Sequence, residues 1–592
     1  MSPARLLAHP ALRTTALLAP LVLLFSLIYV GSLVRMLLTS IDYASLNFQP
    51  YVDLLSDRNI LHSIRSTITM AALVTVICVV ISYPVAITMA RSSALTAKII
   101  TWLIVLPMWI STLVRSYAWI VLLGRQGVTN NLLVGAGIVD RPVSLLYTPF
   151  SVYVGLIYVL LPFSVFPIYN SIKLIDQRLL GAARSLGASR FIAMAAIFFP
   201  LTLPGAAVGS VLVFVMALSY WVTPTLLGGP GDTTFVMIIE KQINLIGNMQ
   251  LGSAMAVVLL VVTVAILLVF QKVLGFGSVI GASGTYSNSG QKLVRMATRA
   301  LVLVTMLGRR GPSAAAASES AASYAEGGRL PDFSRCITFL TIVFFLVPIL
   351  ILIPLSFGSS AYLKFPPTDF SWRWYEAYFG DRDWITATFV SLRVAAATAV
   401  IGVVIGAMAA LALAKASFPF RGALLAVILS PLLVPNIITA VSLYFQLSPL
   451  GLIDTQTGLI LGHLVLATPF VVMVIMGALQ NFDFNLEKAA RSLGAGPLTA
   501  FRTVMLPLIA SAVVTAAFFA FIISFDEVVV AVFVSGPSAP TLPKQLLNAT
   551  RFELSPTIAA ISVILVAGTT LLVLGSELAG RLLRRHEAKR AG

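Results

Sequence analysis

Twelve long apolar runs dominate the chain, and each is long enough to cross a lipid bilayer as a helix, which takes about 20 apolar residues. They lie at residues 13–38, 64–90, 99–123, 149–171, 197–224, 251–275, 335–357, 385–414, 422–446, 457–480, 503–533 and 555–579. In the whole chain 58% of the residues are hydrophobic and 10% are charged, which is more apolar surface than a soluble core could bury. The sequence therefore predicts an all-α polytopic membrane protein with about twelve transmembrane helices.

The basic residues gather on one side of the predicted membrane. With a cytoplasmic N-terminus, most of the 39 Lys and Arg residues fall in segments on the cytoplasmic side, as expected of a multi-pass protein of the plasma membrane. Both termini are then expected to be cytoplasmic. Topology and contact with anionic lipid account for the net charge of +17. Because no basic stripe interleaves with aromatic residues, we expect no nucleic-acid partner.

The apolar runs form two sets of six around a polar segment. Residues 277–334 contain the stretch GRRGPSAAAASESAASYAEGG, whose small and polar composition is typical of a flexible tether. Within it, residues 291–307 mix basic and apolar side chains and are a candidate interfacial helix. Since each set has an even number of spans, we expect two parallel six-helix repeats related by an axis along the membrane normal.

One stretch recurs almost unchanged between the fourth and fifth span of each set. Residues 176–188 and 483–495 are identical at nine of thirteen positions, at a constant offset of 307. Each copy begins with an aspartate suited to cap a helix, Asp176 or Asp483, and ends near a glycine suited to a sharp turn. Between them runs one apolar stripe. Such a stripe in a loop needs a partner to bury it, so we predict a docking site; inert packing on the membrane is the alternative.

The predicted docking positions are the small, basic, glycine and proline residues of the two copies. They are Ala182, Ala183, Arg184, Gly187 and Pro200 in the first copy and Ala489, Ala490, Arg491, Gly494 and Pro507 in the second. The alanines allow another protein to approach closely. Each proline is expected in the opening turn of the next span, where its missing amide costs little.

The repeated stretch resembles the EAA loop of ABC importer permeases. In that loop Glu-Ala-Ala, three residues, Gly, nine residues and Ile-x-Leu-Pro form a coupling helix that docks on the ATP-hydrolysing subunit. Here Gly181 replaces the glutamate of the first copy, and Lys488 replaces it in the second, with Glu487 beside it. The resemblance implies the fold of type I ABC importer permeases.

Two further stretches resemble the spermidine/putrescine type of these permeases. They are SFDEVVVAVFVSGPSAPTLPKQL at residues 524–546 and SYWVTPTLLGGPG at residues 219–231. The resemblance implies two permease units fused in one chain of the inner membrane. It also implies two copies of a cytoplasmic ABC ATPase and a periplasmic substrate-binding protein as partners, with no enzymatic activity in the chain itself.

On this resemblance we divide the chain into six parts. They are an N-terminal span with its outer loop (1–61), a first ABC permease domain (62–276), a cytoplasmic linker (277–334), a seventh span with its outer loop (335–383), a second ABC permease domain (384–579) and a basic C-terminal tail (580–592).

The sequence also limits the chemistry. It contains no G-x-x-x-x-G-K-[ST] motif, so the nucleotide must be handled by another subunit. Its two cysteines and four histidines are too scattered for a metal cluster or a disulfide framework, and we predict no catalytic residues, metal or cofactor. The alternative function is a twelve-span secondary transporter driven by an ion gradient, but such transporters usually carry charge relays inside their spans.

Asp526 and Glu527 are adjacent acids inside the predicted eleventh span. A carboxylate in lipid costs about 3 kcal/mol, so these two need a reason to be there. At the 307 offset the first half places Tyr220 near them, followed by Trp221. Carboxylates facing aromatic rings attract an organic ammonium. We therefore assign these four residues to the substrate pathway.

This pathway predicts a cationic amine as the solute, with polyamines first and amino-acid-like or opine compounds next. An ion pair of the acids with Arg393 or Arg115 is the alternative explanation for the charges.

Overall fold

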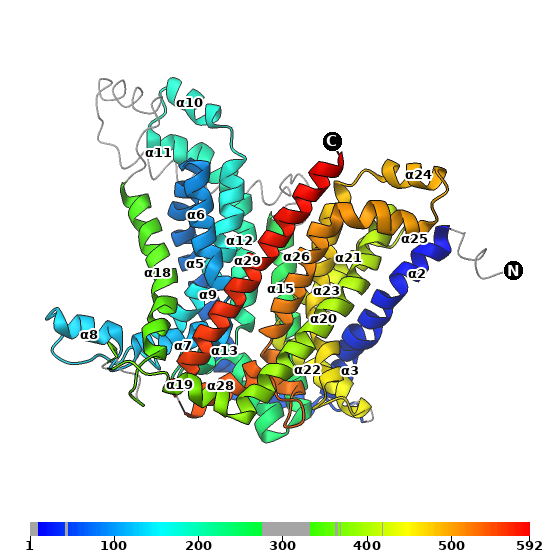
Figure 1. The fold of residues 1–592 in the computed structure, drawn as a ribbon. Helices are drawn as coiled ribbons and strands as arrows, with labels where there is room; N and C mark the ends of the chain where they lie inside the picture. The colour runs from blue at the N-terminus through cyan, green and yellow to red at the C-terminus, as the bar shows by residue number, and fades with distance from the viewer. Residues whose placement is uncertain are drawn as a thin grey trace.

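The computed structural model describes residues 10–41, 45–274, 332–361, 365–367, 369–416, 418–553 and 555–591. These residues form a bundle of helices, most of them running between two opposite faces of the molecule (Figure 1). The only β-structure among them is an isolated bridge between Gly358 and Phe370. Most of the predicted linker, including the candidate interfacial helix at 291–307, lies outside the described residues.

The predicted spans are found as helices. Among the described residues nine helices are long and apolar enough to cross a membrane, and eleven if each of two sharply bent pairs counts as one span. The twelfth segment is the apolar stretch Thr557–Val573 within a helix that continues to Ala591. The predicted tail at 580–592 is therefore helical as far as Ala591.

The described residues of the first half form fourteen α-helices. They are α2 (Pro10–Leu23), α3 (Gly31–Ser40), α4 (Gln49–Ser56), α5 (Arg58–Arg91), α6 (Ala94–Val105), α7 (Thr112–Leu123), α8 (Val128–Gly135), α9 (Pro149–Lys173), α10 (Gln177–Ser185), α11 (Arg190–Ala193), α12 (Phe199–Ser219), α13 (Val222–Leu227), α14 (Phe235–Glu240) and α15 (Met249–Leu274).

The second half contains twelve labelled α-helices among the described residues. They are α18 (Asp332–Ser356), α19 (Arg373–Gly380), α20 (Arg382–Lys415), α21 (Arg421–Leu429), α22 (Asn436–Leu447), α23 (Gln456–Gln480), α24 (Phe484–Ser492), α25 (Pro497–Ala500), α26 (Leu506–Phe525), α27 (Val529–Val534), α28 (Leu542–Phe552) and α29 (Thr557–Ala591).

The two halves repeat the same helices in two registers. From α4 and α19 to α7 and α22 the offset is 324, because α7 begins at Thr112 and α22 at Asn436. From α9 and α23 onward it is 307, because these helices begin at Pro149 and Gln456. The difference of 17 residues (324 − 307) is an insertion in the first half that contains α8.

Two predicted spans are sharply bent. The segment with α6 and the 3₁₀ turn Leu106–Trp109 meets α7 at an angle of 98°, and α21 with the 3₁₀ turn Ser430–Leu432 meets α22 at 101°. Pro107 and Pro431 lie in these turns, at the same position in the 324 register. A proline removes one backbone hydrogen bond and clashes with the preceding turn, so the predicted spans at 99–123 and 422–446 are each broken into two helices.

Two other predicted spans end early. The runs at 197–224 and 503–533 were expected to be continuous, but α12 ends at Ser219 and α26 at Phe525, and a short helix follows each break. In the first half Pro224 explains the break, because its ring would clash with the carbonyl of Tyr220, four residues earlier.

The first span of each half packs on the other half. In the first half α3 contacts α22, α2 contacts α20, and the π-turn Leu24–Val30 between them contacts α23. In the second half α18 contacts α5, α6 and α7. Each of these spans also contacts the last helix of its own half, α15 or α29. The first span of each half therefore packs mainly on helices of the other half (Figure 1).

Candidate functional site

The repeated loop of each half folds as a short capped helix, as predicted. The carboxylate of Asp176 accepts a hydrogen bond from the amide of Arg178 at 2.9 Å, at the start of α10. That of Asp483 accepts one from the amide of Asn485 at 2.9 Å, at the start of α24. These bonds satisfy amides that have no partner within the helix.

Both helices end in the turn that the glycines predict. Gly187 has a φ of 85° and Gly494 a φ of 91°, a left-handed conformation that residues with a side chain rarely adopt. The amide beyond each glycine donates to an alanine carbonyl inside the helix, Ala188 to Ala183 at 3.0 Å and Ala495 to Ala490 at 3.1 Å. This bonding closes the helix end and reverses the chain.

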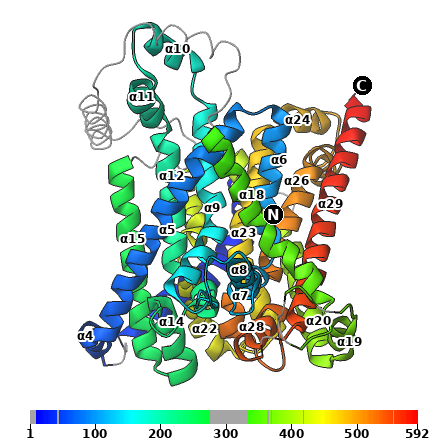
Figure 2. The ribbon, with the colours of Figure 1, turned by 90° about the vertical axis from the view of Figure 1, so that its left-hand side faces the viewer.

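The apolar stripe of each helix is uncovered. Leu186 is 89% exposed and Leu493 is 90% exposed. Ala182 and Ala489 are exposed, while Ala183 and Ala490 are partly buried. Both helices lie at the same end of the bundle as the described ends of the chain (Figures 1 and 2); we call this end the loop face. An exposed apolar stripe on a capped helix is the geometry of a docking surface.

The basic and proline positions of the two copies complete this surface. Arg184 lies in α10, and Arg491 lies in α24 with an exposed side chain. Pro200 and Pro507 lie in the first turn of α12 and α26, as predicted. A π-turn precedes each of these helices, at Met194–Phe198 and Phe501–Met505.

The two loop helices are anchored differently. In α24 the carboxylate of Glu487 pairs with the ammonium of Lys415 at the end of α20, and this ammonium also lies 5.6 Å from the ring centroid of Phe484. The matching position in α10 is Leu180, which packs against the small apolar cluster around Ile172. Glu487 is thus engaged within the chain, although it lies beside the position of the motif glutamate.

Asp526 joins the two halves near the face opposite the loop face. Its Oδ2 accepts a hydrogen bond from the amide of Thr112 at 3.3 Å, so the carboxylate lies at the N-terminus of α7, where the helix dipole favours negative charge. The buried Arg115 donates to the hydroxyl of Thr112 at 2.8 Å. Among the described residues, neither Arg115 nor Arg393 forms an ion pair with Asp526. Thr112 therefore connects the two charged groups, because it donates to Asp526 and accepts from Arg115.

Glu527 has a different role from its neighbour. Its Oε1 accepts hydrogen bonds from the amides of Val529 at 2.8 Å and Val530 at 3.0 Å. These are the first amides of α27, so the carboxylate caps that helix. The two acids thus lie at the break between α26 and α27 and not in one continuous helix. Asp526 contacts the other half of the chain, whereas Glu527 caps α27.

The predicted aromatic residues lie close to this junction. Tyr220 lies beside Thr112 and in the electrostatic field of Arg115 and Asp526. Trp221 is only 2% exposed, and the guanidinium of Arg551 lies 5.0 Å from its ring centroid. The face of Trp221 therefore already holds a cation that belongs to the chain.

Sequence reasoning did not assign Thr112 or Arg551 to this site. Thr112 has no sequence signal, because a threonine in an apolar run is ordinary. Arg551 could not have been found either, because the 307 register does not place it near Trp221. Arg115, a charge inside an apolar run, did carry a signal.

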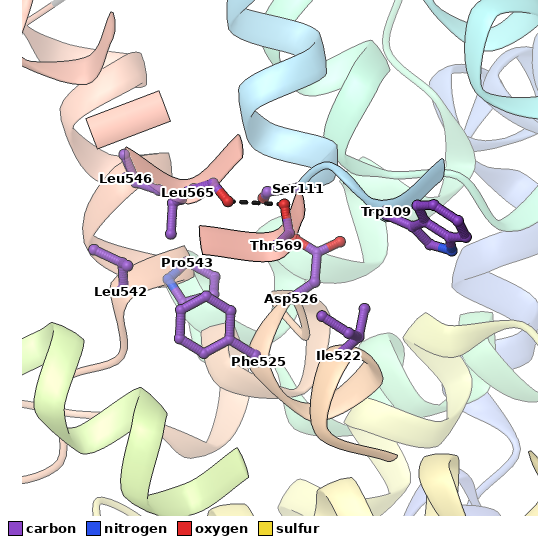
Figure 3. A pocket seen from close by; sticks show the side chains of 10 residues that line it. All are labelled: Trp109, Ser111, Ile522, Phe525, Asp526, Leu542, Pro543, Leu546, Leu565 and Thr569. Carbon is purple, nitrogen blue, oxygen red and sulfur yellow. Dashed lines mark hydrogen bonds between the residues drawn. The ribbon is translucent and has the colours of Figure 1, made fainter. Parts of the chain in front are cut away.

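A small, partly open cavity borders Asp526 (Figure 3), and its space of about 10 Å³ is enough for the centre of about one water-sized group. Both halves line it, with Trp109 and Ser111 from the bend before α7 and the remaining residues from α26, α28 and α29. The lining residues are Trp109, Ser111, Ile522, Phe525, Asp526, Leu542, Pro543, Leu546, Leu565 and Thr569.

This architecture defines a class: a membrane protein built of two repeated helical units, each with one exposed loop helix on the same face. The chain matches the family described as "Binding-protein-dependent transport system inner membrane component" twice, over residues 82–277 and 402–589. It therefore belongs to this family. Its members are transport permeases of ABC importers, not enzymes, and they work with a periplasmic binding protein and an ATPase. Membership supports an ABC importer permease and not the transporter driven by an ion gradient.

Two relatives each cover about 41% of the chain, which is consistent with a fusion of two permease units. The chain is 34% identical over 242 residues to the spermidine/putrescine transport system permease protein PotB of Escherichia coli, covering 41% of this chain and 85% of that protein. It is 32% identical over 243 residues to the corresponding permease protein PotC of Haemophilus influenzae, covering 41% of this chain and 94% of that protein. The match to a solved bacterial alginate ABC transporter has 21% identity and a TM-score of 0.38, over 46% of this chain and 95% of that one. The assignment rests on the family and the two relatives.

Proposed function

We propose that the chain supplies both membrane units of an importer for small organic cations of the polyamine class. Two relatives, each covering about 41% of this chain, are permease proteins of spermidine/putrescine transport systems. The Asp526 carboxylate lies at the junction of the two halves and forms no ion pair with an arginine in the described part of the chain. It supports a cationic solute, since a carboxylate inside a membrane protein usually serves a pathway. We propose that Tyr220, Trp221 and Glu527 lie next to this pathway.

We further propose that one ATPase subunit docks on α10 and a second on α24. The observation that carries this proposal is the exposure of Leu186 and Leu493 at about nine-tenths of their surface. On this proposal the loop face and both termini are cytoplasmic, and the opposite face receives the binding protein. We also propose the six-part division of the chain given above, in which the first span of each half is counted apart from its permease domain.

The test is transport by the reconstituted system. The full chain would be placed in proteoliposomes with its ATPase and binding protein, and uptake of labelled putrescine and spermidine would be measured with and without ATP. We expect uptake that requires ATP and survives collapse of the proton gradient. Uptake that needs the gradient and not ATP would overturn the mechanism. ATP-driven uptake of an anion or a neutral sugar, with no amine uptake, would overturn the substrate class.

A further inference from the structure

The cavity beside Asp526 has one polar end. Oδ2 of Asp526 accepts from the amide of Thr112. Oδ1 is buried and has no partner with hydrogen-bond geometry among the described residues, and the hydroxyl of Ser111 lies close enough to interact with the carboxylate. Figure 3 shows the Asp526 side chain beside Ser111 and Thr569, with Leu546 and Leu565 to one side. A buried carboxylate oxygen without a donor is costly, so this oxygen is suited to receive a donor from a ligand.

The polar end matches an ammonium group. A primary ammonium carries three N–H donors, and this end offers Oδ1 of Asp526 together with the hydroxyl oxygens of Ser111 and Thr569. Thr569 already donates its proton to the carbonyl of Leu565 at 2.8 Å, which leaves its oxygen free to accept. The rings of Trp109 and Phe525 also line the cavity, and ring faces attract a cation.

The rest of the cavity matches a hydrocarbon chain. Its other walls are the apolar side chains of Ile522, Leu542, Pro543, Leu546 and Leu565. Asp526 is the single charged residue of the lining, and the neighbouring Glu527 is occupied as the cap of α27. The cavity therefore accommodates one water-sized ammonium head, with an aliphatic chain extending from its open side along the apolar walls. It offers no carboxylate for a second ammonium.

We propose that this cavity, built by both halves, binds one ammonium group of an alkylamine through Asp526, with the methylene chain against the leucine wall. This inference rests on the proposed function, because it names the place where the cationic solute is held within the membrane unit. It also assigns separate roles to the two adjacent acids: Asp526 binds the ammonium and Glu527 supports the fold.

The test measures binding without transport. The full chain in nanodiscs, with neither ATPase nor binding protein, would be titrated by calorimetry with butylammonium, putrescine and neutral 1-butanol. We expect both amines to bind and butanol not to bind. Asp526→Asn should weaken butylammonium binding by at least about tenfold, because a charge-assisted hydrogen bond is lost. Asp140→Asn, the same change at an exposed loop carboxylate, should leave it unaltered.

A second variant guards against a fold defect. Leu546→Trp fills the apolar wall without touching a charge and should weaken binding of the same amine, while the protein keeps the monodisperse elution profile of the wild type. Amine binding that is unaffected by both variants overturns the proposal. If binding follows the prediction but the reconstituted system imports no amine, the cavity stands and the proposed function fails. If amine uptake proceeds normally in Asp526→Asn, the cavity lies outside the transport route and the proposal is wrong.

Discussion

The loop helices α10 and α24 have nearly the same sequence and the same caps, yet they are fixed to the bundle by different forces. An ion pair from Glu487 to Lys415 holds α24, whereas apolar packing of Leu180 holds α10. The same contrast recurs at the far ends of the next spans, where Asp526 and Glu527 in the second half match Ser219 and Tyr220 in the first.

A third position shows the same pattern in a connecting loop. Tyr147 and Asp454 occupy matching positions with positive φ values of 60° and 59°. Each amide donates to the matching carbonyl, Leu227 at 3.1 Å or Val534 at 2.8 Å. Only Asp454 adds a carboxylate, which accepts from the amides of Ser538 and Ala539. At these three places the two halves share the same backbone conformation, and the second half adds a carboxylate that the first half lacks.

The largest expected effect tests what the two halves share. Ala183→Glu and Ala490→Glu each place a charge on the apolar stripe, and a buried unpaired charge costs at least about 3 kcal/mol, or more than about 100-fold in affinity. Each variant should lose the ATPase on co-purification and lose uptake. Ser185→Glu and Ser492→Glu, about 200° away around the helix, are the matched controls. Loss at only one helix would show that the two docking surfaces are not equivalent.

The next effect tests a charge that only the second half has. Glu527→Ala removes the cap of α27 and should lower the free energy of unfolding by about 1 kcal/mol. Glu527→Gln keeps an acceptor oxygen and should cost less. The measurement is the thermal unfolding midpoint of the purified protein. Equal destabilisation by the two variants would mean that the negative charge, and not the capping oxygen, stabilises this region.

A smaller effect is expected at the anchor of α24. In a double-mutant cycle with Lys415→Ala and Glu487→Ala, the coupling energy should be about 0.2–1 kcal/mol, as for other exposed pairs. Neither single variant should detach the ATPase, because Glu487 is engaged within the chain. Detachment by Glu487→Ala while Lys415→Ala has no effect would show instead that this carboxylate contacts the partner.

The smallest effect is a dependence on pH. Burial opposes the charged form of Asp454, but the amides of Ser538 and Ala539 and the nearby Lys544 outweigh it and hold the pKa of the carboxyl below its ordinary value of 3.8. Because the folded-state pKa is lowered, the stabilisation is fully present above pH 3.8 and is lost as the pH falls through the lower value. The difference in unfolding midpoint between wild type and Asp454→Asn should therefore shrink as acid is added. A difference that stays constant to the lowest pH would contradict this account.

Much of the fold was predictable because it depends on local composition. Apolar runs of about 20 residues mark spans, and the caps at Asp176 and Asp483 and the turns at Gly187 and Gly494 are decided within a few residues. These predictions are confirmed. The size of the two bends, nearly 100°, could not be predicted, because an apolar run looks alike whether its helix is straight or broken.

The site was harder to predict because it depends on contacts between distant segments. Asp526 and Glu527 have nearly the same chemistry in the sequence. Only the fold shows that Glu527 meets amides of its own half while Asp526 reaches Thr112, 414 residues away. The exchange of first spans carries no sequence signal either, since the lipid-facing and protein-facing sides of such helices are equally apolar.

The exchanged first spans determine when the first half can pack during synthesis of the chain. Helix α3 packs on α22, and the hydroxyl of Ser32 bonds that of Ser442 at 3.0 Å. From Ser40 to Leu447 the ribosome must add 407 residues (447 − 40), which takes roughly 20–80 s at about 5–20 residues per second. The first half cannot complete its packing until the second half has emerged from the ribosome. In a fused chain the ribosome delivers the missing partner at a fixed time and in equal number, whereas separate subunits would have to meet by lateral diffusion.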